Sequence, residues 1–428
     1  MKTSKVWTHV AWSEAWARLR PGTLLVAAAL LAAVMFQACG KKVADGFEEG
    51  RARFDEAKFS EALPLFEHAA QSRRDDPAAY AWLAETYRRL GRKSEAVTAA
   101  EQALALDQCN SFALVVIADA VNPMLGKWEG SDPERTWRSL NEAVRCDSTD
   151  GNAWLGIWGE ALHRLDVPMM RRAEGKLIET GFLSDAVLAF SRWTMRALPE
   201  NAILITNGDM DTYPTYVIQK VQSFRPDVAI INRSLLSTLS YQRYVRDHEG
   251  VPMPFDDAAL ERLAPERDEQ GNVRMPSDQI FQRWTDQARG GQFRRPIAIA
   301  ATVDESFLQN YKANLVPSGG FLLYAVKPGQ AGSGIDAMRR SLVGVKAADF
   351  AGPWTVERDR SPIRRMTTKS LVHTVTATAL TLGEAAADQK NWDQARAMAE
   401  FAAEIERTSE AGTNFPDRLA ALNKRITP

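Results

Sequence analysis

The sequence predicts two fold classes in series: a solenoid of repeated helix pairs, then a domain in which helices alternate with the strands of a parallel sheet. A helical hairpin is expected to close the chain. Three observations predict this. Small and aromatic residues recur every 34 residues in the N-terminal part, four short apolar runs alternate with helical patterns at 199–330, and the small-residue spacing returns at 392–402. At about 150 residues per domain, a chain of 428 residues has room for two or three domains.

Composition and charge indicate an ordinary globular protein. Apolar residues make up 45% of the chain and charged residues 25%, and the formal net charge is −1. A nucleic-acid-binding chain normally carries a surplus of basic residues. The sequence therefore predicts no nucleic-acid partner.

Residues 1–38 have the layout of a secretory leader. Basic residues precede an apolar run at 23–36, which is shorter than the roughly 20 apolar residues that a membrane-spanning helix needs. The following Ala38-Cys39-Gly40 resembles the lipobox of bacterial lipoproteins, and this resemblance implies a lipidated Cys39. A short uncleaved membrane anchor and an ordinary signal peptide are the alternatives. We expect a cell-envelope protein on the periplasmic side, attached to a membrane through lipidated Cys39 or an N-terminal anchor.

Besides Cys39, the chain contains two cysteines, Cys109 and Cys146. Both lie near the ends of second helices in successive repeats, where equivalent points are usually farther apart than a disulfide allows. An oxidising compartment would permit a bond, but the expected geometry predicts that the two thiols are unpaired.

The 34-residue period is carried by Ala62, Phe66 and Ala69, which align with Ala96, Ala100 and Ala103. Small residues let two helices approach closely, while large residues fill the space beside them. This pattern resembles the tetratricopeptide repeat (TPR), a helix pair of 34 residues. The signature positions in this chain are Ala62, Phe66, Ala69, Tyr80, Leu83, Ala84, Tyr87, Gly91, Ala96 and Ala103.

Later repeats are irregular. A helix at 111–125 is followed by an insertion at 126–133, and a fourth unit begins at 152–165. We assign residues 39–198 to the TPR array. Stacked repeats leave a concave groove, so the sequence predicts a protein partner in the TPR groove. The alternative is that these helices only brace the adjoining domain.

Residues 199–330 read as a Rossmann-like α/β domain. Apolar, β-branched runs at 202–206, 227–232, 296–301 and 320–326 predict buried strands, and helical patterns lie between them. Such alternation is typical of a parallel sheet.

Residues 331–362 are predicted as a linker, partly because Gly329, Gly332 and Gly334 lack the lysine and spacing of a phosphate-binding loop. Residues 363–428 are predicted as a TPR-like helical hairpin. Its second helix carries Ala395, Ala399 and Ala402 at the repeat spacing.

Residues 197–237 carry a second resemblance. An N-G-D-x-D-T segment at 207–212, an R-x-D-V segment at 225–228 and an N-x-S-L-L segment at 232–236 follow one another. This order resembles the soluble C-terminal region of bacterial membrane proteins related to protein O-mannosyltransferases. It is also similar to TPR lipoproteins that carry this module alone. The resemblance implies kinship, but it implies no transferase chemistry, because the multispanning catalytic part is absent.

Polar residues follow the predicted strands, where ligands bind in open α/β sheets. Asp209-Met210-Asp211 also has the Asp-x-Asp form that can hold a divalent cation. Alternatively, Asp211 or Thr212 caps a helix that begins at Pro214. The candidate ligand-binding residues are Asn207, Asp209, Asp211, Thr212, Asn232, Ser234 and Asp304.

The function that the sequence predicts is a protein-interaction scaffold or adaptor in the envelope. We expect no catalytic residues, no metal and no cofactor. The alternative is a carbohydrate-related enzyme, or a module that binds a sugar or sugar nucleotide, with the loop at 209–211 at its centre.

Overall fold

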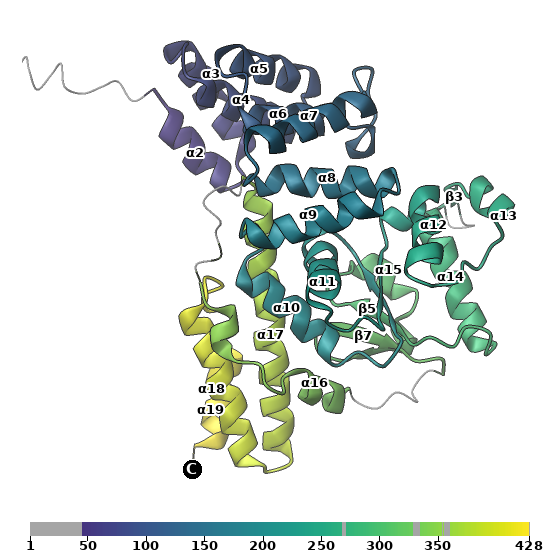
Figure 1. The fold of residues 1–428 in the computed structure, drawn as a ribbon. Helices are drawn as coiled ribbons and strands as arrows, with labels where there is room; N and C mark the ends of the chain where they lie inside the picture. Colours follow the sequence, from purple (N-terminus) through teal and green to yellow (C-terminus); the bar gives the residue numbers. More distant parts are fainter. Residues whose placement is uncertain (1–44, 268–270, 328–333, 353, 355–359, 428) are drawn as a thin grey trace, which may run out of the picture.

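The computed structural model describes residues 45–267, 271–327, 334–352, 354 and 360–427. A helical solenoid leads into a sheet domain, and a group of C-terminal helices lies beside both (Figure 1). The predicted leader and Cys39 lie outside the described residues. Within the described ranges, no helix is long and apolar enough to cross a membrane.

The part of the solenoid that the structure describes consists of four antiparallel helix pairs, each packed against the next. The pairs are α2 (Phe47–Asp55) with α3 (Phe59–Ser72), α4 (Pro77–Arg89) with α5 (Lys93–Leu106), α6 (Ser111–Val121) with α7 (Pro133–Cys146), and α8 (Gly151–His163) with α9 (Val167–Glu179). The predicted helical repeats are confirmed.

Small residues let these helices approach closely. Ala62, Ala69, Ala96 and Ala103 are fully buried, and Phe66 fills the space beside them. Five of the helices begin at a carboxylate or amide that accepts a backbone N–H, which satisfies an otherwise unpaired donor. These capping residues are Asp76, Asn110, Asp132, Asp150 and Asp166.

The disulfide prediction was wrong, because Cys109 and Cys146 are bonded, with their Cα atoms 5.2 Å apart. The sequence argument treated the two cysteines as equivalent points. Ala103 aligns with Ala143, so the equivalent of Cys146 is Leu106. Cys109 lies beyond the end of α5, in the turn to α6, and this turn carries it toward the end of α7. The Cα separation of the two cysteines therefore lies within the range that a disulfide requires.

The middle domain contains two sheets among its described residues, reached through α10 (Asp185–Arg196). Its strands are β1 (Ile203–Thr206), β2 (Ala229–Asn232), β3 (Glu266–Arg267), β4 (Val273–Arg274), β5 (Ile297–Ala300), β6 (Leu315–Pro317) and β7 (Phe321–Tyr324). Its helices are α11 (Asp209–Gln222), α12 (Leu239–His248), α13 (Asp257–Arg262), α14 (Pro276–Arg289) and α15 (Glu305–Gln309), with 3-10 turns η2 (Leu235–Ser237) and η3 (Lys312–Asn314).

The main sheet is mixed, so the prediction of a wholly parallel sheet was wrong. Its strand order is β2-β1-β5-β7-β6. β1 pairs parallel with both β2 and β5, while β7 pairs antiparallel with β5 and β6. The cause is β6, a strand ending in Pro317 that the sequence pattern did not reveal. The chain crosses from β5 through α15 to β6, and a short turn then returns β7 between them.

The predicted linker and hairpin also need correction. The linker contains α16 (Ile335–Ser341) and η4 (Ala347–Phe350), and three helices follow it: α17 (Pro362–Asp388), α18 (Trp392–Thr408) and α19 (Pro416–Ile426). Gly334 begins this packed region with φ +71°, and a Cβ there would lie 1.7 Å from the carbonyl oxygen of Pro317. This glycine is required by close packing against β6.

One hydrophobic core joins the last helix pair of the solenoid to the sheet. Trp158 of α8 packs edge-on against Tyr213 of α11, with ring centroids 4.6 Å apart. Buried residues of α9, β1, β2 and β5 belong to the same core. On the other side, α17 packs against α10 and α11 (Figure 1). The concave side of the solenoid is therefore held beside the strand ends and the beginning of α17.

Candidate functional site

A groove of about 750 Å³ runs along the first helices of the repeats and ends at the sheet domain. Its walls come from α4, α6 and α8 on one side, from the loop between β1 and α11 at the base, and from the start of α17. The solenoid groove and the strand-end loop, which the sequence suggested separately, are therefore parts of one cavity. Its volume is within the usual range of ligand-binding clefts.

The loop after β1 is organised by Asp211. The Asp211 carboxylate accepts backbone N–H groups from Asn207 (2.8 Å) and Gly208 (2.9 Å), and it also accepts the Thr302 hydroxyl. Helix α11 begins at Asp209 and contains Pro214, so the predicted helix start at Pro214 was wrong. Asp211 acts from inside the first turn, where a carboxylate can reach back to unpaired N–H groups. Burial raises the pKa of Asp211, and these hydrogen bonds oppose the rise.

Thr212 and Asn232 lie behind the groove wall. The Thr212 hydroxyl is 2.7 Å from the Thr206 hydroxyl and accepts the Asn232 amide at 2.9 Å. Asn232 in turn accepts the Leu235 N–H. All these side chains bind one another, so they fix the ends of β1 and β2. Thr212 and Asn232 are not among the groove-lining residues.

Ser234 and Asp304 have different positions. Ser234 lines the groove and donates its hydroxyl to the Asn207 carbonyl oxygen at 3.2 Å. Asp304 lies outside the groove lining, where it caps α15 and pairs with Arg233 at 3.0 Å. The structure therefore brings Asn207, Asp209, Asp211 and Ser234 together in the groove.

Asp209, at the start of α11, lines the groove together with Asp211, and it is the more exposed of the two. It is exposed to solvent within the groove, yet the surrounding walls partly desolvate it and raise the pKa of its carboxyl. The Arg364 guanidinium and a hydrogen bond from Tyr213 oppose that rise. The polar end of the third predicted strand, at Thr302, was expected to lie beside this loop, and its hydroxyl does reach Asp211. The sequence analysis missed Arg364, because nothing local places the start of α17 here, and it missed Tyr213, which directly follows the loop.

The solenoid wall carries paired charges. Arg88 and Arg89 both donate to the buried Glu85, at 2.6 and 2.7 Å, and Arg88 lies 3.5 Å from Asp119. Burial alone would raise the pKa of Glu85, but the two guanidinium groups hold it below its ordinary value. Burial raises the pKa of Asp119 despite Arg88. Buried charges are tolerated here because each one has an opposite partner.

Apolar side chains lie between these charges and at the groove mouth. Phe112, Leu155 and Trp158 contribute to the walls. Met124 and Leu125, from the 3-10 turn η1 (Pro123–Leu125), are 48% and 55% exposed and also line the groove. This turn directly follows α6 and precedes the predicted insertion at 126–133.

Arg360 and Arg364 close the groove at the start of α17. Arg360 donates to both carboxylate oxygens of Asp150, at 3.1 and 2.9 Å, and Arg364 donates to Asn152 at 2.6 Å. Burial would raise the pKa of Asp150, but Arg360 and the hydrogen bonds from Asn152 and Ser111 hold it below its ordinary value. These contacts tie the C-terminal helices to the start of α8.

Other basic residues stabilise the backbone. Arg225 donates to the carbonyl oxygens of Met195, Leu198 and Pro199 at 2.8–2.9 Å. Arg295 donates to the carbonyl oxygens of Asn201, Ala202 and Asp227, among others. Among the residues with described side chains, no group of three or more His, Cys, Asp or Glu is placed to hold a metal ion.

The comparisons with known proteins agree with the repeat assignment. Residues 53–111 match the tetratricopeptide repeat model, and residues 187–269 match the model named TMEM260-associated domain 2. No curated protein matches the chain significantly.

Two of the solved structures that are similar to this chain are TPR proteins. A thermophilic TPR protein of Thermus thermophilus is 17% identical over 50% of this chain and 93% of its own, with a TM-score of 0.30. The TPR domain of P58(IPK) is 12% identical over 89% of this chain and 96% of its own, with a TM-score of 0.18. Both TM-scores are too low to support an argument about arrangement. Together, the family match and the observed helix pairs show tetratricopeptide repeats at residues 53–111, and the helix pairs that follow are TPR-like in their packing.

Proposed function

We propose that this protein is an exported scaffold of the cell envelope, and that its groove binds an apolar segment of a protein partner. The observation that carries the proposal is the set of exposed apolar side chains at the groove mouth. Met124, Leu125 and Ile363 are 48%, 55% and 49% exposed, and all three line the groove. Exposed apolar side chains that gather at a concave surface are typical of interaction sites.

The groove chemistry suits an extended or helical segment with apolar anchors. Its charged walls are already neutralised by internal pairs such as Arg88 with Glu85 and Arg360 with Asp150. If a partner covered these ion pairs, the cost of desolvating the charges would offset most of their attraction, so they would add little to the binding affinity. Apolar contacts with Phe112, Leu155 and Leu125 would therefore provide most of the binding energy, while Asp209 at the base would select polar groups of the partner.

The Cys109–Cys146 disulfide supports the exported location. Structural disulfides persist in oxidising compartments and are rare in the cytosol. With the leader at 1–38, this favours a protein outside the cytoplasm, attached through a lipid on Cys39. Mass analysis of the mature N-terminus tests the anchor: a diacylated Cys39 supports it, and an unmodified chain with an intact leader contradicts it.

We propose that the module after the repeats is related to a known family and has a structural role. The segment at 197–237, which resembles the soluble region of protein O-mannosyltransferase-related membrane proteins, lies within the match to TMEM260-associated domain 2. Asp211, Thr212 and Asn232 are occupied by internal hydrogen bonds. We therefore infer that the module orients the groove.

The groove is tested by a charge introduced at its mouth. We expect the double variant Leu125→Glu, Ile363→Glu to lose a co-purified partner by about tenfold or more, because a carboxylate in an apolar contact is costly to desolvate. The measurement is quantitative mass spectrometry of complexes isolated after crosslinking in cells. The matched control is Val221→Glu, Val343→Glu, whose side chains are 44% and 67% exposed and lie outside the groove. Equal recovery from both double variants would contradict the proposal.

A carbohydrate or sugar-nucleotide ligand remains the second candidate, because Asp209 faces the groove with solvent access. Only Asp209 of the Asp-x-Asp pair is available, since Asp211 is held by the loop and Thr302. Calorimetry with Mn²⁺ and sugar nucleotides distinguishes the candidates. Saturable binding that disappears in Asp209→Asn would favour the sugar ligand over the protein segment.

A further inference from the structure

One carboxylate of the solenoid wall differs from its neighbours. Glu85 accepts hydrogen bonds from Arg88 and Arg89, and Asp119 lies 3.5 Å from Arg88. Glu160 of α8 also lines the groove and is only 6% exposed. Among the described residues, however, no basic side chain forms an ion pair with Glu160. Removing a carboxylate from water without a cationic partner costs free energy, and a ligand that supplied a cation here would offset this cost.

Glu160 is held by a neutral hydrogen bond. The Asn122 amide donates to its carboxylate at 2.9 Å, while the Asn122 side-chain oxygen accepts the Met124 N–H at 2.9 Å. The Arg164 guanidinium pairs with Glu134 at 2.9 Å instead of with Glu160. Burial raises the pKa of Glu160, and the Asn122 hydrogen bond and the Arg164 charge oppose this rise. A neutral amide compensates a carboxylate less well than a guanidinium or ammonium group does.

Apolar side chains lie beside this carboxylate at the groove mouth. Asn122 links Glu160 to η1, whose Met124 and Leu125 line the groove and are about half exposed. A lysine or arginine side chain combines an apolar stem with a cationic head. Its stem would contact Met124 and Leu125 while its head reached Glu160. A wholly apolar side chain would instead cover Glu160 without balancing its charge.

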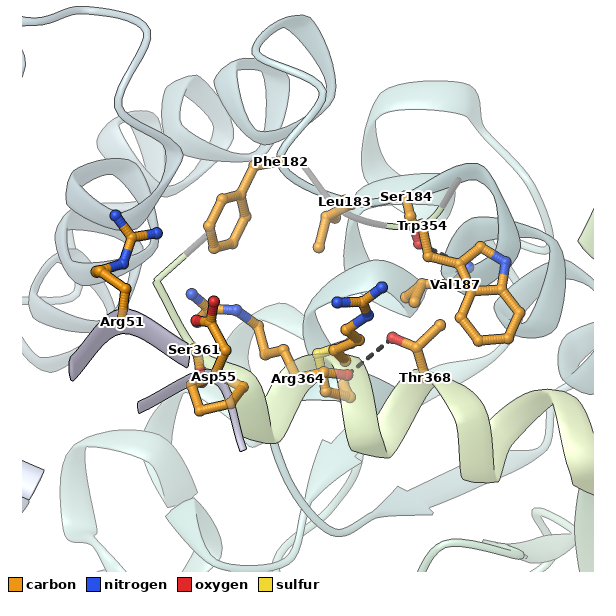
Figure 2. A pocket seen from close by; sticks show the side chains of 13 residues that line it. Arg51, Asp55, Phe182, Leu183, Ser184, Val187, Trp354, Ser361, Arg364 and Thr368 are labelled. Atoms are coloured by element: carbon orange, nitrogen blue, oxygen red, sulfur yellow. Dashed lines mark hydrogen bonds between the residues drawn. The ribbon is translucent and has the colours of Figure 1, made fainter. Parts of the chain in front are cut away.

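The two ends of the groove differ in charge. Arg360 and Arg364 line the end at the start of α17, where Arg364 donates to Asn152 of α8. This end shares Arg364 with a smaller cavity of about 120 Å³, and Figure 2 shows Arg51 on another side of that cavity. Glu160 follows Asn152 by eight positions, which is about 12 Å along the axis of α8. A cationic side chain is therefore better accommodated at the Glu160 end.

We propose that Glu160 binds a lysine or arginine side chain of the protein segment that occupies the groove. Asn122 holds the carboxylate in place, and Met124 and Leu125 contact the stem of the basic residue. This role of Glu160 rests on the proposed function, since it requires a protein segment in the groove. It adds a charge requirement to the apolar contacts, so a segment without a basic residue would bind more weakly.

Selection from a library of short random peptides against the immobilised full chain tests this role. We expect the selected peptides to combine apolar residues with a lysine or an arginine. Glu160→Gln keeps an oxygen that accepts the Asn122 amide but removes the charge, so peptides selected on it should keep the apolar residues and lose the basic one. The matched control is Glu142→Gln, at an exposed ion pair with Arg145 outside the groove, which should keep both preferences.

A double-mutant cycle then isolates the contact. In the tightest selected peptide, the basic residue is replaced by its uncharged analogue, acetyl-lysine for lysine or citrulline for arginine, which keeps most of the stem. Calorimetry should show about tenfold weaker binding to the unmodified chain, because a charge-assisted contact is lost. On Glu160→Gln, the same replacement should change the affinity by less than about twofold. Equal weakening on both chains would overturn the role of Glu160.

Two glycine variants separate failure of this role from failure of the proposed function. A Cβ at Gly159 of α8 or at Gly175 of α9 would meet no atom within 4 Å, so there is open space at both positions. Gly159 lines the groove, whereas Gly175 does not. Gly159→Leu should therefore lower peptide recovery about tenfold, since it partly fills the groove, and Gly175→Leu should leave recovery unchanged.

The possible outcomes differ in what they contradict. Peptides that are lost in Gly159→Leu but show no preference for a basic residue would overturn the role of Glu160 and leave the groove as a binding site. If no peptides are enriched on the unmodified chain, or if Gly159→Leu and Gly175→Leu recover them equally, both the role of Glu160 and the proposed function would be contradicted.

Discussion

At the scale of single residues, most of the charged and polar positions that suggested chemistry serve the local backbone. Asp211 accepts two N–H groups of its own loop, and Arg225 donates to three carbonyl oxygens that precede β1. The sequence could predict a cap near Asp211, because capping follows from local spacing. It could not predict the hydrogen bond from Thr302, since that residue is 91 positions away along the chain.

Arg225 provides the first residue-scale prediction. Arg225→Lys should lower the free energy of unfolding by about 2 kcal/mol, because an ammonium cannot reproduce the planar set of hydrogen bonds to Met195, Leu198 and Pro199. Urea unfolding measures the effect. The control is Arg243→Lys, at an exposed ion pair with Glu261, which should change stability by less than about 0.5 kcal/mol. Equal losses in the two variants would refute the role assigned to Arg225.

The variant Arg225→Lys should also change the pKa of Asp227. A hydrogen bond from Arg225 lowers the pKa of Asp227 to about 2. A carboxyl with a lowered pKa stabilises the fold above its unfolded pKa of about 3.9, and this contribution is lost as the pH falls toward 2. In Arg225→Lys, the pKa of Asp227 should rise toward its ordinary value, as measured by NMR titration.

At the scale of elements, the repeats and strands follow from local patterns, but their pairing does not. The 34-residue period predicts the helix pairs because each helix must bury its own small and aromatic residues. β6 was missed because it is three residues long and ends in a proline, which is unfavourable in a strand interior. The antiparallel part of the sheet depends on that strand, so its direction could not be predicted.

The disulfide is an element-scale device that ties the turn after α5 to the end of α7. The double variant Cys109→Ser, Cys146→Ser should lose about 3 kcal/mol of stability, because a crosslink between residues 37 apart restricts the unfolded chain. Urea unfolding with and without reductant measures the loss. The unmodified chain should be weakened by reductant, whereas the variant should be insensitive. A reductant effect of equal size on both would rule out this disulfide as the cause.

At the scale of the whole molecule, the ion pair between Asp150 and Arg360 joins residues 210 positions apart. The Asp150 side chain is 2% exposed and that of Arg360 is 15% exposed, so the pair is largely removed from water. It holds the C-terminal helices against the start of α8 and thereby closes the end of the groove.

Asp150→Asn should cost about 3 kcal/mol of stability, because the buried Arg360 charge would lose its partner while the amide could still cap α8. The pKa of Asp150 is lowered by Arg360 and the neighbouring hydrogen bonds, against the effect of burial. The deficit of the variant should therefore be largest near pH 7 and shrink as the pH falls below about 4, where the unmodified chain loses the same contribution.

Chemical denaturation at several pH values measures this dependence. Asp166→Asn is the matched control, since Asp166 caps α9 in the same manner and forms no ion pair among the described residues. A deficit of Asp150→Asn that does not change with pH would show that the Arg360 pair is not responsible.

The sequence by itself determined the helix pairs, the presence of most strands and the loop that follows β1. Each of these features depends on residues that are close together in the chain. The periodicity of their apolar side chains indicates which face of a helix or strand is buried. Only the tertiary structure decided the disulfide, the mixed sheet, and the union of the solenoid groove with the strand-end loop. These features rest on contacts such as Arg360 with Asp150 and Thr302 with Asp211, between segments whose local patterns do not specify each other. The groove is formed where such segments meet, so its composition was visible only in the folded chain.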